Sequence, residues 1–235
     1  MNAKPVLDAF DRYQRFLIGT HVNPDPDALA SQVALGLFLE SRGKKVSLIG
    51  EAPVPERFSF LPGMNKIKPL GRKRSLRYDA AIITDAGDID RIGMVRRLLA
   101  EGRPVINIDH HVTNTGFGDI NYVVADASST CEVVFGLLKR SGAELTRDLA
   151  ELLYVGAMTD TGSFRYSNTS ARTHLMVADL MRFPIEANGL YKRIYEQVPL
   201  NDLKYFTKLV SEFDSLYDGK LICVDLPRAI VKKFS

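Results

Sequence analysis

Cysteine is scarce in this chain of 235 residues, since only Cys131 and Cys223 occur, too few for a disulfide framework. This scarcity favours a reduced environment and so a cytoplasmic protein. Long apolar runs are also missing, because no stretch approaches the ~20 continuous apolar residues of a membrane-spanning helix. Residues 1–16 lack the pattern of a signal peptide, which is an apolar run followed by small residues. These absences exclude a disulfide-rich secreted domain and predict no association with membranes.

Charge of one sign is not in excess either. The chain has 31 Lys and Arg against 28 Asp and Glu, and the formal net charge of +3 is too small to predict nucleic-acid binding by itself. The glycine motifs of P-loop and dinucleotide-binding proteins, GxxxxGK[ST] and GxGxxG, do not occur. With 46% hydrophobic and 25% charged residues, the composition is that of an ordinary globular protein. The length suits one large domain, or one domain and a fragment of another.

Apolar runs alternate with helical patterns over the first 160 residues. The runs predict strands at 15–21, 44–50, 78–87, 103–111 and 120–124. Apolar residues at helical spacing predict helices at 27–42, 91–100, 129–141, 147–159, 171–182 and 186–213, the last broken before Pro199. Runs such as AAIIT and VINI are continuous, which is typical of strands covered on both faces. The order predicts an α/β fold with a mainly parallel sheet flanked by helices.

The pattern changes after Pro199. SLYDGKLICVDL predicts a β-hairpin with Asp218 and Gly219 at its turn, and another helix is expected from Pro227. Three parts are therefore predicted: a complete α/β domain at 1–185, a helical connector at 186–213, and the incomplete start of a second α/β domain at 214–235.

Acidic and histidine residues gather where predicted strands and helices end. Four motifs hold them: HVNPDPDA (His21, Asp25 and Asp27), TDAGD (Asp85 and Asp88), DHH (Asp109, His110 and His111) and TDTGSF (Asp160). Because the carboxyl ends of parallel strands share one edge of a sheet, we expect about four carboxylates and three histidines to meet there.

Carboxylates so close together raise one another's pKa unless cations offset their charge. Carboxylates and imidazoles without thiolates suit Mn²⁺, Mg²⁺, Fe²⁺, Co²⁺ or Zn²⁺, and so many ligands favour two ions roughly 3.5–4 Å apart. Such a pair polarises a phosphoryl oxygen and generates a hydroxide for in-line attack. Each motif has a structural alternative when taken singly, for example Asp25 or Asp27 as a helix N-cap. Four motifs that each follow an apolar run favour the metal site.

In this order the four motifs resemble those of the DHH phosphoesterases. The segments DIDRIG, DHHVTNTGFGDINYV, SSTCE and TDTGSFRYSNTS are similar to one branch, the nanoRNases and pAp phosphatases, also called bifunctional oligoribonucleases and PAP phosphatases. The resemblance spans nearly all of residues 10–213. It implies a hydrolase of phosphoester bonds that acts on short oligoribonucleotides and on 3′-phosphoadenosine 5′-phosphate (pAp). It also implies two Mn²⁺ ions, for which Mg²⁺ or Co²⁺ can substitute.

The resemblance further implies a role for each motif residue. Six would be metal ligands: His21 and Asp25 for the first ion, Asp85 for both, and Asp27, His110 and Asp160 for the second. His111 would lie near the substrate phosphate as a hydrogen-bond donor or acid, and Asp109 would orient the histidines, as metal-bound imidazoles generally require.

Two features depart from the family pattern. The first motif usually reads PDGDA, and Pro26 replaces its glycine, so Asp25 and Asp27 both reach metal only if the turn accepts a φ near −65°. Family members also carry a C-terminal DHHA1 domain, whose glycine-rich, His-containing motif grips the nucleotide end of the substrate. That motif has no match here, and residues 214–235 resemble only the opening strands of that domain.

Three further residues are candidates for substrate binding. Ser129 and Thr130 open a predicted helix, where they either cap it together with Glu132 or hold a phosphate at its N-terminus. The resemblance favours the substrate. Arg165 follows the fourth motif and either neutralises phosphate or pairs with a surface acid. Cys131 is expected to be a small buried residue, not a nucleophile.

Other functions stay open on the sequence. A cyclic-dinucleotide phosphodiesterase, a RecJ-like exonuclease or a pyrophosphatase would use the same chemistry. A non-catalytic module that binds nucleotides or a partner would account for Pro26 and for the unmatched C-terminal motif. Short RNA and nucleotides are the expected partners, and the resemblance is compatible with a homodimer.

Overall fold

The computed structural model describes residues 2–72, 75–197, 200–211 and 213–225. The chain divides into two compact units, Met1–Ile185 and Glu186–Ser235. No helix within the described residues combines the length and the apolar character that crossing a bilayer requires.

A parallel sheet forms the centre of the first unit. Its strands are β1 (Arg15–Gly19), β2 (Lys45–Gly50), β3 (Lys68–Pro69), β4 (Ala80–Thr84), β5 (Val105–Asp109) and β6 (Ile120–Val123). They lie in the order β3-β2-β1-β4-β5-β6, and every neighbouring pair is parallel. The α/β fold with a parallel sheet is thus confirmed. The strand order reverses between β1 and β4, the position at which open α/β sheets bind ligands.

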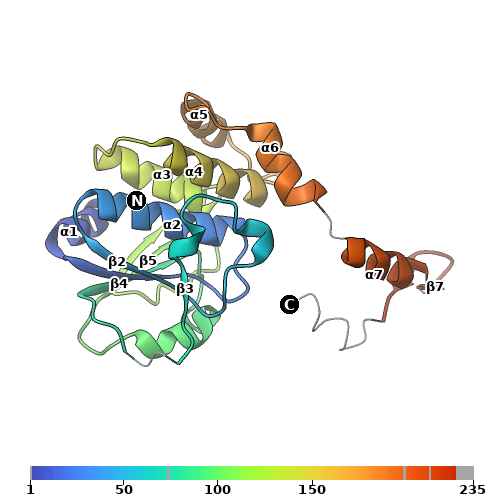
Figure 1. Ribbon diagram of the computed structural model, residues 1–235, viewed down its shortest axis with the longest axis horizontal. Coiled ribbons are helices and arrows are strands. Elements are labelled where there is room, and N and C mark those ends of the chain that lie inside the picture. Colours follow the sequence, from blue (N-terminus) through green and yellow to red (C-terminus); the bar gives the residue numbers. More distant parts are fainter. Residues whose placement is uncertain (1, 73–74, 198–199, 212, 226–235) are drawn as a thin grey trace. The chain divides into compact units, whose positions relative to one another are not determined.

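Helices cover one side of this sheet. Figure 1 shows α2 (Pro26–Ser41), α3 (Thr130–Arg140) and α4 (Arg147–Asp160) together above the strands, where the three contact one another. They correspond to three predicted helices, and α5 (Ala171–Leu180) corresponds to a fourth. Because α2 lies between the sheet and its neighbouring helices, it buries residues all around its circumference.

One predicted helix, on the other side of the sheet, is wrong. The helix predicted at 91–100 is a stretch of 3₁₀ turns, η3 (Ile89–Leu98), interrupted at Gly93, where φ is 55° and ψ is −132°. Val95 and Leu98 of this segment pack against the strands. The interruption brings the backbone against the loop after β1, where a side chain at position 93 would collide with that loop.

Several short elements were not predicted. They are α1 (Lys4–Arg12), η1 (Glu56–Phe58), η2 (Met64–Lys66) and the two-residue strand β3. The nine-residue α1 is held by Phe10, which packs edge-on against Phe16 and Phe38. Elements this short depend on tertiary contacts more than on local propensity.

The second unit begins with α6 (Ala187–Tyr191), continues as a π-helical turn (Lys192–Glu196), and contains α7 (Leu200–Ser211). The predicted hairpin is confirmed, since β7 (Asp214–Leu216) and β8 (Leu221–Cys223) are antiparallel and the turn holds Asp218 and Gly219 at positive φ. Pro199 and the helix expected from Pro227 lie outside the described residues. A connector at 186–213 and a second domain at 214–235 stay predictions.

Candidate metal centre

The four motifs meet at the carboxyl ends of β1, β4 and β5. The hydroxyl of Thr20, just after β1, donates to the carbonyl of Thr84 at the end of β4 over 2.8 Å, and so ties the two central strands together. His21 and Asp85 follow these two residues directly, and Asp109 ends β5. The site therefore lies where the strand order reverses.

Asp85 occupies the middle of the site in an unusual backbone conformation. Its φ is 56°, in the left-handed region that few residues other than glycine adopt. Its amide donates to the carbonyl of Ile108 over 3.0 Å, which holds the turn in place. The buried carboxylate faces two imidazoles: Oδ2 is 3.5 Å from His21 Nε2, and Oδ1 is 3.7 Å from His110 Nε2. A strained residue fixed between two histidines is typical of a functional position.

Two sets of three side chains each bring their ligand atoms within 4.8 Å of one another. The His21 group consists of His21, Asp25 and Asp85, and the Asp27 group consists of Asp27, His110 and Asp160. A third set, Asp85 with His110 and His111, links the two. The six residues proposed from the motifs as metal ligands thus come together as two adjacent triads.

Both imidazoles are oriented by backbone carbonyls. His21 Nδ1 lies 2.7 Å from the carbonyl oxygen of Val22, and His110 Nδ1 lies 3.3 Å from that of Ala127. A proton on each Nδ1 leaves Nε2 with a free lone pair toward the carboxylates. Metal-binding histidines in proteins are commonly oriented in this way.

Pro26 is compatible with both carboxylates of the first motif. Asp25 is the N-cap of α2, where its Oδ1 accepts from the amide of Ala28 over 2.9 Å, and Pro26 is the first helical residue. Proline suits that position because its φ is already helical and its missing N–H would be unpaired anyway. Asp25 then joins the His21 group while Asp27 joins the Asp27 group.

The N-terminus of α3 holds Asp27. The amide of Thr130 donates to Asp27 Oδ2 over 2.7 Å, and the amide of Cys131 donates to Oδ1 over 3.0 Å. Each oxygen keeps another lone pair for a ligand. The helix N-terminus favours a negative charge at this point, although the carboxylate is buried.

The carboxylates are too crowded to be ionised together without cations. Burial raises the pKa of Asp27 well above its ordinary value, and the charges of Asp85 and Asp160 add to the effect. Burial also raises the pKa of Asp160 to about 6, helped by the charges of Asp85 and Asp25 and opposed by His110. Divalent cations would remove this repulsion, so the donor set fits metal binding.

The side chains of Ser129 and Thr130 point into the protein. Ser129 caps α3 by accepting from the amide of Glu132 over 3.0 Å, and Thr130 donates from Oγ1 to Asp85 Oδ1 over 2.8 Å. Both residues are fully buried, so a direct substrate contact through them stays a prediction. Arg165 is exposed, and its Nε donates to the carbonyl of Gly162 over 2.9 Å.

The DHH motif contains a hydrogen-bonded chain that ends at His111. His111 Nδ1 lies 2.7 Å from Asp109 Oδ1, and the amide nitrogen of Asn114 donates to Asp109 Oδ2 over 2.6 Å. Burial alone would raise the pKa of Asp109, but the bonds from His111 and Asn114 outweigh it and hold the pKa below its ordinary value. The bond to Asp109 also raises the pKa of His111. Asp109 thus orients His111.

Asn114 and its partner Asn107 were missed in the sequence. Asn114 also donates to Asn107 Oδ1 over 2.7 Å, and Asn107 donates to the carbonyls of Ile83 and Ala86. These side-chain amides, of which that of Asn107 is fully buried, connect β5 to the turn that carries Asp85. The sequence held one signal for these contacts: Asn107 is the polar residue in the apolar run VINI, and a buried amide needs hydrogen-bond partners.

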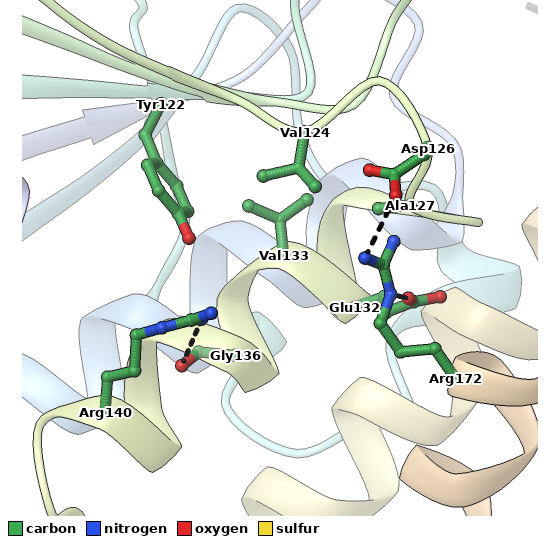
Figure 2. Close-up of a pocket in the computed structure, with 9 residues that line it drawn as sticks. All are labelled: Tyr122, Val124, Asp126, Ala127, Glu132, Val133, Gly136, Arg140 and Arg172. Atoms are coloured by element: carbon green, nitrogen blue, oxygen red, sulfur yellow. Dashed lines mark hydrogen bonds and ion pairs between the residues drawn. The ribbon is translucent and has the colours of Figure 1, made fainter. Parts of the chain in front are cut away.

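Glu132 was also underestimated. Its carboxylate accepts from the amide and hydroxyl of Ser128 and from the hydroxyl of Thr173, and it pairs with Arg172. Figure 2 shows Arg172 between Glu132 and Asp126. These three residues belong to the lining of a cavity of about 200 Å³. The expected capping pattern is therefore modified, since the Glu132 side chain bonds Ser128 and not the N-cap residue Ser129. Through Thr173 and Arg172, Glu132 also attaches the N-terminus of α3, which binds Asp27, to α5.

Comparisons with known proteins show the family of this chain. Residues 15–157, more than half of the chain, match the DHH family, N-terminal domain. The bifunctional oligoribonuclease and PAP phosphatase NrnA of Bacillus subtilis is 29% identical over 227 residues, which cover 94% of this chain and 69% of that protein. A protein of the same name from Thermus thermophilus is 28% identical over 215 residues, which cover 89% and 62%.

A solved structure extends the similarity to the fold. An exopolyphosphatase-related protein from Bacteroides fragilis matches with a TM-score of 0.87 at 27% identity, covering 99% of this chain and 72% of that one. This chain spans about two thirds of the length of these relatives. Four ordered motifs, two triads of ligand atoms and the family match agree, and the chain belongs to the DHH family of phosphoesterases, hydrolases that act on phosphoester bonds.

Proposed function

We propose that this protein is a two-metal phosphoesterase that hydrolyses short oligoribonucleotides and pAp. The observation that carries the proposal is the pair of adjacent ligand triads with Asp85 between their two histidines. The His21 group would hold one Mn²⁺ ion and the Asp27 group a second, with Asp85 shared, and Mg²⁺ or Co²⁺ would substitute. Bound in this way, the ions would polarise the phosphoryl group and make a water acidic enough to attack it at neutral pH.

The protein's own residues would orient the substrate and supply a proton. His111 is partly exposed, and its Nδ1 is fixed on Asp109. Its Nε2 would bond a phosphate oxygen or protonate a leaving group. Asn114 keeps Asp109 in place. Thr130 and the N-terminus of α3 hold the carboxylates of Asp85 and Asp27 at fixed angles.

The choice of substrate follows the relatives. The proteins from Bacillus subtilis and Thermus thermophilus are named for action on oligoribonucleotides and PAP, and this chain aligns with them over 94% and 89% of its length. In this proposal residues 186–213 connect the catalytic domain to a substrate domain that starts at 214–235.

Hydrolysis assays with the protein at saturating Mn²⁺ would test this proposal. A ribodinucleotide and pAp should both be turned over, and the protein should bind two Mn²⁺ ions per chain. Turnover of neither substrate would contradict the proposed function, and fewer than two ions would favour a binding module instead. Pyrophosphate should be assayed beside these two substrates, because a probable manganese-dependent inorganic pyrophosphatase of Streptococcus pyogenes is 24% identical over 173 residues.

A further inference from the structure

Arg91 lies beside the metal centre and has no role in the site described so far. It belongs to DIDRIG, the segment that follows the second motif. Its carbonyl accepts from the amide of Val22 over 2.8 Å, and Val22 directly follows His21. Its own amide donates to the carbonyl of Asp88 over 3.2 Å. Arg91 is thereby fixed between the loop after β1 and the turn after β4, the two segments that carry His21 and Asp85.

The backbone that follows Arg91 is closely packed. Ile92 is fully buried and packs with Ile83 and Ala86. Gly93 has a φ of 55°, and a Cβ there would collide with the side chains of Val22 and Glu51, so the chain lies directly on the loop after β1. A side chain on such a fixed backbone loses less conformational entropy when it binds a ligand.

The guanidinium of Arg91 has no protein partner among the described residues, and the residue is exposed. The neighbouring acids are engaged elsewhere: Asp88 accepts from the amide of Asp90, and Asp90 pairs with Arg96 over 2.6 Å. The turn that holds Arg91 lies against His111, since a Cβ at Gly87, next to Asp88, would be 3.4 Å from the Cβ of His111. Arg91 therefore brings an unpaired positive charge to the side of the centre where His111 lies.

A phosphate at this centre needs such a charge. Two divalent cations would offset only the four carboxylates of the two groups, Asp25, Asp27, Asp85 and Asp160, and leave the charge of a substrate unmatched. The hydroxyls of Ser129 and Thr130 face inward. Arg165 already uses its Nε on Gly162. A guanidinium matches the geometry of phosphate oxygens and can bind two of them.

We propose that Arg91 binds a non-bridging oxygen of the substrate phosphate, next to His111. This inference deepens the proposed function and rests on its phosphoester chemistry, but it does not depend on the identity of the nucleotide. Arg91 would set the affinity for the phosphate, while the metal ligands and His111 would carry the chemical step.

Arg91→Gln tests this assignment. It should raise KM for pAp and for bis(p-nitrophenyl) phosphate, and weaken the binding of inorganic phosphate to the Mn²⁺-loaded protein, by about 10- to 100-fold, the range for a hydrogen bond to a charged group. The kcat should change less, and Mn²⁺ content should not change. Arg91→Lys should be intermediate, because lysine keeps the charge but not the planar fork. Arg97→Gln is the matched control, since it removes another exposed arginine from η3.

The outcomes separate this inference from the proposed function. Phosphate affinity and KM of Arg91→Gln within twofold of wild type would overturn it, and so would a loss of Mn²⁺ or a lowered melting temperature in both Arg91 variants. If the wild type cleaves bis(p-nitrophenyl) phosphate but neither the dinucleotide nor pAp, the proposed substrates are wrong. The KM of Arg91→Gln for bis(p-nitrophenyl) phosphate then still tests the role of Arg91. If it cleaves nothing, the binding of inorganic phosphate decides. If Arg165→Gln raised KM and weakened phosphate binding by about 10- to 100-fold while Arg91→Gln changed neither, the phosphate would be assigned to Arg165.

Discussion

The two ligand groups are built differently. In the His21 group, Asp25 is exposed, and its carboxylate accepts the N-cap hydrogen bond from the amide of Ala28. In the Asp27 group, Asp27 is buried, and both of its oxygens accept backbone amides of α3. One carboxylate is held by its own helix, and the other by the end of a helix about a hundred residues away in the sequence.

This difference ties the Asp27 group to the fold. The α3 N-terminus that binds Asp27 is itself fixed by Ser129 and by Glu132, which pairs with Arg172 on α5. Asp25 of the His21 group depends instead on the short loop between β1 and α2. We therefore expect changes in the Asp27 group to affect stability as well as metal, and changes at Asp25 to affect mainly metal.

Asp85 serves both groups, so its loss should have the largest effect. Asp85→Asn keeps the shape of the side chain, and asparagine tolerates the φ of 56°. Loss of the shared ligand should lower kcat by at least about 10³-fold, because metal polarisation contributes several kcal/mol to the transition state. Steady-state kinetics and Mn²⁺ content would measure it. Asp90→Asn changes an exposed carboxylate five residues away and should stay within twofold of wild type.

The sequence could predict the parts that repeat a simple pattern. Continuous runs such as AAIIT located the strands, and the motifs after them located His21, Asp85 and the DHH residues because parallel strands end at one edge. It could not locate η3, since a glycine inside a helical pattern does not reveal that the loop after β1 presses on it. Contacts that join distant segments have no local signal.

The same reason explains what was missed inside the site. Asn114 and Glu132 were visible as polar residues, but their partners Asn107, Arg172 and Thr173 are identified only by the fold. Thr130 was predicted either to help cap the helix or to hold a phosphate, and the resemblance favoured the substrate. The structure shows its hydroxyl on Asp85, a contact between residues 45 positions apart.

Alanine substitutions at Asp27 and Asp25 would sharpen the comparison between the groups. Asp27→Ala leaves the amides of Thr130 and Cys131 unpaired in a buried place and should lower the free energy of unfolding of the metal-free protein by about 2 kcal/mol or more. Asp25→Ala loses one N-cap bond and should cost about 1 kcal/mol. Urea denaturation would measure both. Equal losses would contradict the structural difference between the two groups.

Metal binding should distinguish these variants as well. Asp25→Ala should retain one tightly bound Mn²⁺ in the Asp27 group, and Asp27→Ala should retain one in the His21 group. Elemental analysis after gel filtration would count the ions. Two ions in both variants would show that neither carboxylate is a required ligand.

The crowding of carboxylates predicts a pH dependence that metal should reverse. The pKa of Asp160 is raised to about 6, from an ordinary value of 3.8, so the metal-free protein binds more protons at this group than the unfolded chain does. Its contribution to stability is full below about pH 4 and is lost as the pH rises through about 6. Mn²⁺ requires the ionised form, so its affinity should increase between pH 5 and 7, with protons released. Calorimetry in buffers of different ionisation enthalpy would detect the release, and Asp160→Asn should reduce it.

The smallest expected effect on kcat concerns how Asp85 is held. Thr130→Val removes the hydroxyl that donates to Asp85 Oδ1 and nearly preserves the volume of the side chain. Since one hydrogen bond to a charged group is lost, kcat should fall about tenfold, while KM should change less than twofold because the residue is fully buried. Thr130→Ser keeps the hydroxyl and should restore most of the kcat. A rise in KM with unchanged kcat would instead place Thr130 in contact with substrate, as its position at the start of α3 first suggested.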